Sequence, residues 1–274
     1  MRKAITISLL FCSTFLSAQT AELGIFGGVA LYSGDLSPSE FGLYFENSAP
    51  AIGAFGRLYL APWMSTRLSV NTGKLKIEDA DRNRKLDFRS KLTEFNVMAE
   101  FSPLHILRGY RGAFSPYVFA GLGFLRFETE GELDGDWYLL QPLGTEGQGL
   151  PGYDKPYNVT ELSFPLGIGL RIELTEHIVL GLEIGGRKLF TDYLDDVGDT
   201  KVNYRELFEG NGPIAAQISN RQIDPNGETD ITYSRGGAYN DWYYMSGISL
   251  AFAIGNNDTG RRSGGRNEPG CYKF

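Results

Sequence analysis

Apolar and polar residues alternate along several stretches of the chain. In residues 161–174 every second residue is large and apolar, and the residues between them are small or charged. The alternation begins again at Ile178 after a short turn, and it recurs in residues 241–254. A period of two residues is typical of a β-strand whose two faces meet different environments. These stretches therefore predict three strands.

A weaker form of the same pattern adds five strands to this prediction. Its stretches are residues 21–32, 50–60, 64–77, 88–101 and 116–128. The connections between the strands differ in length. The expected shorter turns are residues 61–63, 102–115 and 175–177, and the other connections, residues 33–49, 78–87, 129–158 and 191–239, are mostly longer loops. Transmembrane β-barrels place short turns in the periplasm and long loops outside, which predicts a periplasmic location for both chain ends.

The sequence thus predicts an all-β protein, an eight-stranded antiparallel transmembrane β-barrel with long extracellular loops. The alternative is a soluble, lipocalin-like barrel, which would turn its apolar face inward. The face opposite the large apolar residues is crowded with glycine and with combinations of arginine and glutamate, which favours the membrane barrel. The 35 glycines and 15 tyrosines fit twisted strands and aromatic girdles, and the net charge of −7 argues against a nucleic-acid surface.

The two ends of the chain lie outside this pattern. Residues 1–18 have a positive start, an apolar run and a small last residue, which predicts a secretory signal peptide cleaved after Ala18. The alternative, a membrane-anchor helix, requires about 20 apolar residues, and the run is shorter. The barrel is then expected over residues 19–254, and a periplasmic tail over residues 255–274.

The expected tail is basic, is rich in glycine and asparagine, and contains the one cysteine that remains after cleavage. A mature chain with one cysteine can form no intramolecular disulfide. A disordered, solubilising tail is one interpretation of this composition. The other is a partner-binding tail, whose binding residues would be Arg261, Arg262, Arg266 and Cys271.

Charged residues occupy many positions on the predicted inward face. An eight-stranded barrel has an interior just wide enough for side chains to fill, so these charges must pair with one another and close the lumen. The predicted lumen charges are Arg57, Arg67, Glu94, Glu100, Arg171, Glu183 and Arg187, together with Glu22, Glu161 and Glu173.

Few side chains are available for catalysis. The chain has two histidines, His105 and His177, and both fall in predicted periplasmic turns. Outer-membrane barrels that are proteases or acyltransferases carry their catalytic groups at the extracellular rim. The sequence also contains no cluster of histidine and cysteine that could bind zinc. We therefore expect no catalytic residue and no cofactor.

Two acidic stretches raise the question of a calcium site. Asp79, Asp81 and Asn83 have the spacing of a calcium-binding loop, but arginine and serine occupy the positions of its glycine and glutamate. The second stretch, DYLDDVGD in residues 192–199, contains four aspartates without that spacing. We interpret it as a loop base that is solvated or paired with arginine, and we expect no bound metal.

Five segments resemble, in the same order, a family of Bacteroidetes outer-membrane barrels. They are YSGDLSP (32–38), LQPLGTEGQG (140–149), KPY (155–157), TDYLDDV (191–197) and DWYYMSGISLAF (241–252). TEGQG and TDYLDDV together are quite specific. Most members carry only a domain-of-unknown-function label, and the family includes PorG, the small barrel of the type IX secretion system. Between Gly198 and Arg235 the chain departs from the family's pattern.

The resemblance implies that the acidic segment forms a structural rim. Its carboxylates would fix the long loops. We infer that TEGQG is their partner, through the hydroxyl of Thr145 and the backbone N–H groups of Gly147 and Gly149. The loop-motif residues are Gly34, Asp35, Thr145, Glu146, Gly147, Gln148, Gly149, Thr191, Asp192, Tyr193, Asp195, Asp196, Asp241, Trp242 and Tyr243.

The resemblance also implies a function, that of a non-catalytic barrel which anchors the periplasmic ring of the PorK lipoprotein and PorN to the outer membrane. The expected partners are outer-membrane lipids and this ring lipoprotein, with no nucleic acid. The alternative is a surface-exposed binding or adhesion barrel that acts through its extracellular loops. An extracellular enzyme is a more distant alternative.

Overall fold

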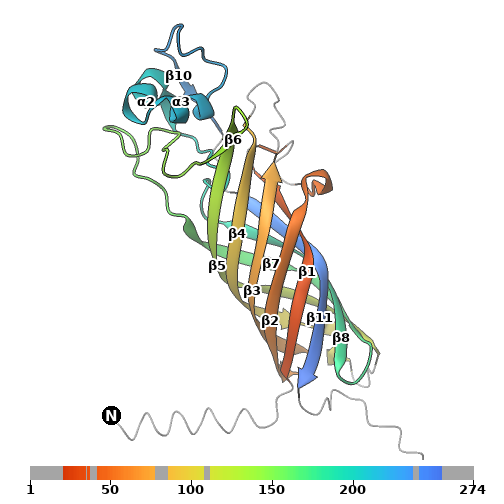
Figure 1. The fold of residues 1–274 in the computed structure, drawn as a ribbon. Helices are drawn as coiled ribbons and strands as arrows, with labels where there is room; N and C mark the ends of the chain where they lie inside the picture. The colour runs from red at the N-terminus through yellow and green to blue at the C-terminus, as the bar shows by residue number, and fades with distance from the viewer. Residues whose placement is uncertain are drawn as a thin grey trace, which may run out of the picture.

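Eight long antiparallel strands close into a barrel (Figure 1). The computed structural model describes residues 21–34, 36–37, 42–77, 86–107, 112–236 and 241–254. The barrel strands are β1 (Ala21–Ser33), β2 (Ala49–Ala61), β3 (Met64–Ile77), β4 (Phe88–Phe101), β5 (Phe114–Leu133), β7 (Thr160–Glu173), β8 (Ile178–Leu189) and β11 (Trp242–Ile254). They pair in the order β4–β3–β2–β1–β11–β8–β7–β5, and β5 pairs with β4 to complete the ring.

The predicted eight-stranded antiparallel barrel is confirmed. β3 and β4 have the bounds that the alternation predicts, and most other strand ends lie within one or two residues of the prediction. The largest difference is in β5, which continues to Leu133 because it forms a hairpin with β6 (Asp136–Leu139) beyond the barrel wall. The expected signal peptide and tail lie outside the described residues.

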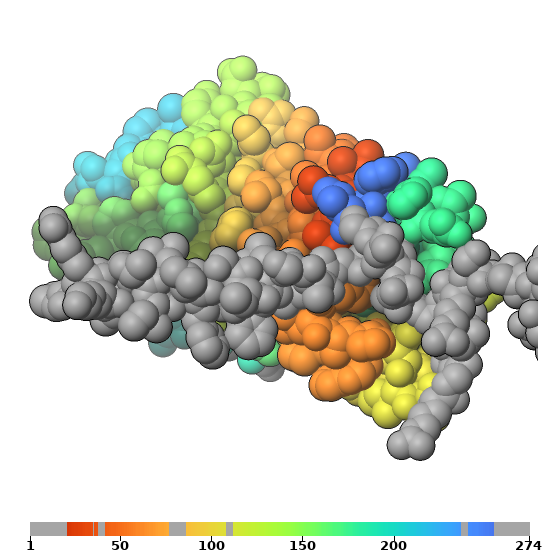
Figure 2. Space-filling model, turned by 90° about the horizontal axis from the view of Figure 1, so that it is seen from below, coloured from red at the N-terminus to blue at the C-terminus, as the bar shows by residue number. Residues whose placement is uncertain are grey.

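The short connections gather at one end of the barrel, which we call the short-turn end. Figure 2 views the molecule from this end and shows the start of β1 in red, the end of β11 in blue and the β7–β8 turn in green. The connection from β4 to β5 contains the short 3-10 helix η3 (Pro103–Ile106). The long loops lie at the opposite end, which we call the loop end (Figure 1). The connections lie at the predicted ends. The β4–β5 connection (residues 102–113) is nevertheless longer than the β3–β4 connection (residues 78–87) at the loop end.

The outward face of the barrel is apolar around its middle. Each barrel strand contributes large, exposed aliphatic or aromatic side chains to this belt, among them Leu23, Ile52, Val70, Phe95, Phe124, Ile168, Leu182 and Ile248. Water-facing surfaces rarely carry so large a continuous apolar patch, whereas hydrocarbon-facing barrel walls require one. The surface therefore does not fit the soluble, lipocalin-like alternative.

The loop end carries a small folded unit that the alternation did not predict. It consists of β9 (Lys201–Asn203), α2 (Tyr204–Gly210), α3 (Pro213–Ser219) and β10 (Thr232–Ser234), and β9 pairs with β10. Its core is formed by Val202, Tyr204, Leu207, Ala215 and Ala216. Two helices of seven residues each are too short to give a clear helical period in the sequence. No helix in the described part of the chain is long and apolar enough to cross a bilayer.

Asn203 sets the start of α2. Its side-chain oxygen accepts hydrogen bonds from the N–H groups of Arg205 and Glu206, at 3.0 and 3.2 Å. These two donors would otherwise have no partner within the helix, and asparagine is among the residues that best satisfy them. The Asn203 N-cap therefore fixes the point at which the chain turns from β9 into α2.

Candidate functional site

A network of buried ion pairs fills the short-turn half of the lumen. Its centre is Glu100 of β4, which is 1% exposed. The Glu100 carboxylate lies 2.7 Å from Arg57 Nε, 3.0 Å from Arg67 Nε and 3.1 Å from Arg171 Nη2. The Ser65 hydroxyl donates a further hydrogen bond to it at 2.8 Å. Strand alternation brings these groups together, because each side chain occupies an inward position on its own strand.

Two further glutamates balance the charge of this network. Glu22 pairs with Arg57, and Glu183 lies 2.6 Å from Arg67 Nη1. The hydroxyl of Tyr117 donates a hydrogen bond to Glu183 at 3.0 Å. Each buried charge thus has a partner, which is the condition under which buried ions are tolerated.

A second polar layer surrounds Glu94 of β4, nearer the loop end. The Glu94 carboxylate accepts hydrogen bonds from Asn71 at 2.7 Å, from Asn96 at 2.8 Å and from the Tyr243 hydroxyl, and Arg187 Nη2 lies 3.4 Å away. The ion pairs among the described lumen residues join four arginines to four glutamates, so their charges cancel.

Apolar side chains fill the lumen from this layer to the loop end, which the sequence analysis did not predict. They are Ala30, Ala51, Leu75, Phe88, Leu92, Leu125, Phe127, Leu189 and Met245, all buried. The expectation that charges plug the lumen therefore applies to its short-turn half and its middle. Beyond them, a packed apolar layer separates the polar interior from the loops.

Because the polar layers and the apolar layer of the lumen are all packed, we expect no steady single-channel conductance from the purified protein in planar bilayers. A wide porin incorporated in the same bilayers should conduct and serves as the positive control. Large, stable conductance steps from the pure protein would contradict a closed lumen.

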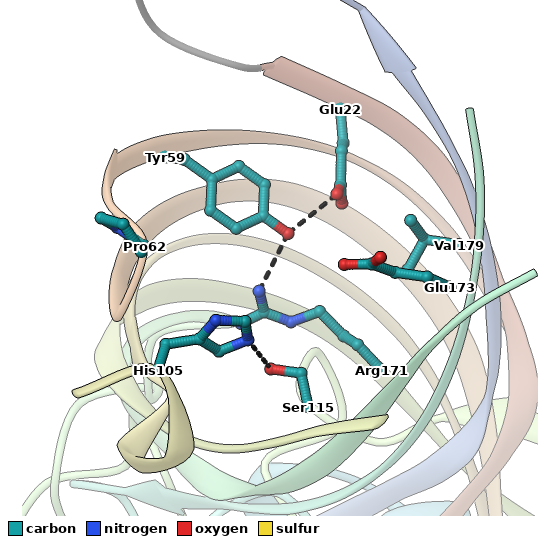
Figure 3. A pocket seen from close by; sticks show the side chains of 8 residues that line it. All are labelled: Glu22, Tyr59, Pro62, His105, Ser115, Arg171, Glu173 and Val179. Carbon is teal, nitrogen blue, oxygen red and sulfur yellow. Dashed lines mark hydrogen bonds between the residues drawn. The ribbon is translucent and has the colours of Figure 1, made fainter. Parts of the chain in front are cut away.

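A small hollow lies at the short-turn mouth of the lumen (Figure 3). The Tyr59 hydroxyl donates to Glu22 at 2.8 Å and accepts from Arg171 at 2.9 Å, while His105 Nε2 and Ser115 Oγ are 3.0 Å apart. Burial and the charge of Arg171 lower the pKa of His105. The space beside these groups is about 20 Å³, enough for one water molecule.

At the loop end, a buried carboxylate holds the long loops together. Asp196, in the loop after β8, is fully buried and has a φ of 64°, which residues other than glycine rarely adopt. Its side chain accepts hydrogen bonds from the Thr145 hydroxyl, from the Tyr157 hydroxyl at 2.8 Å and from Arg235 Nη1 at 3.1 Å. Arg235 Nη1 also donates to Thr145 at 2.7 Å. We call these four residues the upper lock.

A second group, the lower lock, ties the same loop to β1 and β11. The Tyr32 hydroxyl lies 2.6 Å from Asp195 Oδ2 and 2.8 Å from Asp241 Oδ1. The remaining oxygens of these aspartates accept backbone N–H groups, Asp241 from Leu194 at 2.9 Å and Asp195 from Val197 at 3.0 Å. We call residues 140–157 and 191–236, which the two locks hold over the loop end, the cap.

The close approach of the lower lock to β1 explains the glycine of YSGDLSP. A Cβ atom at Gly34 would come 2.1 Å from the Tyr32 hydroxyl and 2.2 Å from Asp241 Oδ1. No larger residue fits there without displacing the lock. The neighbouring motif residue, Asp35, lies outside the described residues.

TEGQG contacts the acidic segment through Thr145 but not through its glycines. The N–H groups of Gly147 and Gly149 donate to backbone carbonyls within residues 144–154, at 2.9 and 2.8 Å. The expectation that they bind the carboxylates is wrong. Both glycines have positive φ, of 80° and 91°, so they serve the turns of their own loop.

Other motif residues surround the locks. Tyr193 stacks on Tyr157 with ring centres 4.7 Å apart. The Thr191 carbonyl accepts a hydrogen bond from the Asp241 N–H at 3.2 Å. The Gln148 side-chain oxygen accepts a hydrogen bond from the Glu146 N–H at 2.9 Å.

The aspartates of residues 192–199 do not converge on one point. Asp195 and Asp196 are buried in different locks, Asp192 is half-buried and Asp199 is exposed. Within the described part of the chain, no group of three or more histidine, cysteine or carboxylate side chains is placed to hold a metal ion. The calcium-like spacing of residues 79–83 falls outside that part.

Comparison with known proteins places the chain in a family. Residues 1–214 match the domain of unknown function DUF6089. The chain belongs to the DUF6089 family. No curated protein matches it.

Several solved structures are similar to this DUF6089 barrel. Neisserial surface protein A is 9% identical, with 87% of this chain and 98% of that chain covered and a TM-score of 0.42. OprG from Pseudomonas aeruginosa is 15% identical, with 85% and 96% covered and a TM-score of 0.40. Ail of Yersinia pestis, in complex with the heparin analogue sucrose octasulfate, is 10% identical, with 85% and 99% covered and a TM-score of 0.38.

Arg235 is the member of the upper lock that no sequence motif indicates. It comes from the far end of the longest loop, 39 residues from Asp196, where no periodic pattern places a side chain. One signal was available, namely an arginine in a loop whose other end carries four aspartates. Charge complementarity alone could not distinguish this arginine from Arg205 or Arg221 in the same loop.

Glu146 is a buried carboxyl of the cap. Its Oε1 accepts a hydrogen bond from the Gly198 N–H at 2.8 Å and lies 3.9 Å from Arg235 Nη1, whereas its Oε2 has no hydrogen-bond partner among the described residues. Burial raises the pKa of Glu146 to about 7, although Arg235 and the Gly198 N–H act in the opposite direction.

The raised pKa of Glu146 predicts a cap that loosens as the pH rises. Between about pH 4.5 and 7 the folded cap binds more protons than the opened one, so its stability falls through this window. We expect Glu146→Gln to remove this pH dependence and to make the cap more resistant to opening than the wild-type cap at pH 8. Hydrogen exchange at Gly198, corrected for intrinsic rates, measures it.

The matched control is Glu209→Gln, which removes an exposed glutamate from α2 of the same cap. This variant should keep the wild-type pH dependence. Equal slopes in Glu146→Gln and wild type would show that ionisation of Glu146 does not govern the cap.

Proposed function

We propose that this protein is a structural barrel of the outer membrane that neither catalyses a reaction nor conducts solutes. The observation that carries the proposal is the convergence of all five segments of the family resemblance on the two locks. These segments contribute Tyr32, Thr145, Tyr157, Asp195 with Asp196, and Asp241. What the segments have in common is thus the closure of a plugged barrel by a fixed cap.

The barrel surface supports the proposed location, and the lengths of the connections support the proposed orientation. The apolar belt suits the hydrocarbon core of a bilayer, and closed barrels are the β-structures that can span one. We place the short-turn end in the periplasm and the loop end outside, in keeping with the lengths of the connections.

We further propose that the barrel is the outer-membrane component of a type IX secretion system and anchors a PorK/PorN-type periplasmic ring. The resemblance to the family that includes PorG supports this assignment. In the proposed orientation, the short-turn end and the tail of residues 255–274 face the ring. A barrel with a packed lumen suits an anchor because it adds no leak to the membrane.

One observation favours a second candidate, a surface barrel that binds a ligand or another cell. The unit formed by β9, α2, α3 and β10 has its own buried core and projects from the loop end (Figure 1). An anchor that works through its periplasmic face has no evident need for it.

Deletion of residues 256–274 separates the two candidates. Because β11 ends at Ile254, the truncated barrel should reach the outer membrane at wild-type level and keep its heat-modifiable gel migration. For a ring anchor, we expect loss of the ring lipoprotein after mild detergent extraction and impaired type IX secretion. A surface-binding barrel should be indifferent to the deletion.

The control replaces residues 256–274 by a glycine–serine segment of equal length, which should fail in the same way if the basic residues and Cys271 bind the ring. A reciprocal variant replaces residues 202–233 by a short linker. It should retain the ring in an anchor and lose surface binding in the second candidate. Normal ring recovery and secretion from the truncated barrel would contradict the tail assignment.

A further inference from the structure

A patch of like charges lies on the outward face of β3 and β4 near the loop end. The register places Lys74 directly opposite Lys91, and Lys76 directly opposite Arg89. All four side chains are exposed. Like charges directly opposite each other on neighbouring strands destabilise a sheet. Two successive pairs of this kind therefore call for a counter-charge.

The next strand supplies only part of it. On β5, Glu130 lies opposite Arg89 and Glu128 lies opposite Lys91. Glu130 reaches Arg89 Nε at 2.5 Å. Neither Lys74 nor Lys91 forms an ion pair with another residue that the structure describes. Among the described residues, the patch thus keeps an excess of positive charge.

The same side chains border a groove of about 520 Å³. Trp137 of β6 also lines this groove, and its ring centre lies 4.2 Å from the guanidinium carbon of Arg89. β3, β4, β5 and β6 lie side by side in this part of the barrel (Figure 1). The groove therefore offers cations and an aromatic face together on the outside of the barrel wall.

The patch lies beyond the apolar belt, toward the loop end. Five outward-facing rows run across the wall, each with one residue from β3, one from β4 and one from β5. Two rows are apolar, the third has two threonines and an arginine, and the last two are charged. In order toward the loop end, the rows are Leu68–Val97–Leu122, Val70–Phe95–Phe124, Thr72–Thr93–Arg126, Lys74–Lys91–Glu128 and Lys76–Arg89–Glu130. Each row rises roughly 5 Å along the barrel axis, which puts the lysines roughly 10–15 Å beyond the last apolar row. Lysine side chains can reach back from there to headgroup depth.

We propose that this groove binds the phosphate-bearing headgroup of an outer-leaflet lipid, with Lys74, Lys76, Arg89 and Lys91 as its phosphate ligands. The inference rests on the proposed membrane location and orientation. The groove opens on the lipid-facing side of the wall, where a headgroup anion can lie against it while its acyl chains follow the apolar rows below. Trp137 holds the Arg89 guanidinium over its ring and completes the wall of the site.

The test uses the full mature chain in phosphatidylcholine nanodiscs with and without added lipid A, whose disaccharide carries phosphates. The test variant combines Lys74→Gln with Lys91→Gln. The matched control combines Lys155→Gln with Lys201→Gln, which removes the same charge from exposed positions in the cap. We measure lipid A retained by native mass spectrometry and the temperature at which gel migration changes.

We expect the test variant to retain about tenfold less lipid A than wild type and the control, and to lose the rise in melting temperature that lipid A gives them. Without lipid A, the test variant should melt no lower than wild type, because it has lost an opposed pair of like charges. Equal retention in all three proteins would overturn the proposal. So would inorganic phosphate reproducing the whole stabilisation, since the ligand would then be free phosphate. A wild-type chain that does not insert would contradict the membrane location instead.

Discussion

Replacement of Glu100 by glutamine is expected to leave most of the chain unable to complete a stable barrel. Glu100 neutralises three arginines at once, with Arg57, Arg67 and Arg171 all within 3.1 Å of its carboxylate. Removal of one partner from a buried ion pair costs about 3–5 kcal/mol, because the remaining charge stays out of water without compensation. A loss of this size is a large fraction of the stability of a typical folded domain.

The measurement is the fraction of heat-modifiable barrel in lipid vesicles as a function of urea concentration. Glu46→Gln, at an exposed position in the loop after β1, removes the same charge and should leave the midpoint unchanged. Glu100→Gln combined with Arg67→Met should recover part of the loss, because the two residues act as one unit. If Glu100→Gln alone kept the wild-type urea midpoint, the network would not contribute to barrel stability.

The lumen also shows where strand alternation stops being informative. The alternation assigned Arg57, Glu100 and Arg171 to the inward face, because lipid outside and protein inside impose a period of two on every strand. It did not say which charges meet. Arg67 pairs with Glu183, 116 residues away, and that contact depends on the stagger of strands around the ring.

Leu75, Leu92 and Leu125 share the inward parity of these charges, yet they form an apolar layer. Alternation identifies the face of a strand but not the height at which the lumen changes from polar to apolar. The cap was harder still, since Arg235 and the helices of its folded unit lie in a loop with no strand period. Only the composition of the acidic segment and of TEGQG pointed to a contact there, and Thr145 and Glu146 are the TEGQG residues that make it.

The double variant Asp195→Ala with Asp196→Ala should open the cap and leave the barrel intact. Both aspartates are buried, and each belongs to a different lock. Without Asp196, the guanidinium of Arg235, which is 4% exposed, loses the carboxylate closest to it among the described residues. The cost of about 3–5 kcal/mol falls on cap closure and not on strand pairing, because both residues lie in the loop beyond β8.

Hydrogen exchange should therefore quicken by a factor on the order of a hundred or more across residues 194–198, since each 1.4 kcal/mol corresponds to a factor of ten. Exchange in the barrel strands and the temperature of the gel shift should stay at wild-type values. Asp199→Ala with Glu209→Ala removes two exposed charges from the same cap and should change neither.

If the aspartates instead held calcium, calcium would raise the melting temperature of wild type and not of the double variant. We expect no rise, because their oxygens are already engaged by Tyr32, Thr145, Tyr157 and Arg235. Unchanged exchange in the double variant would mean that the folded unit closes the loop end without the locks.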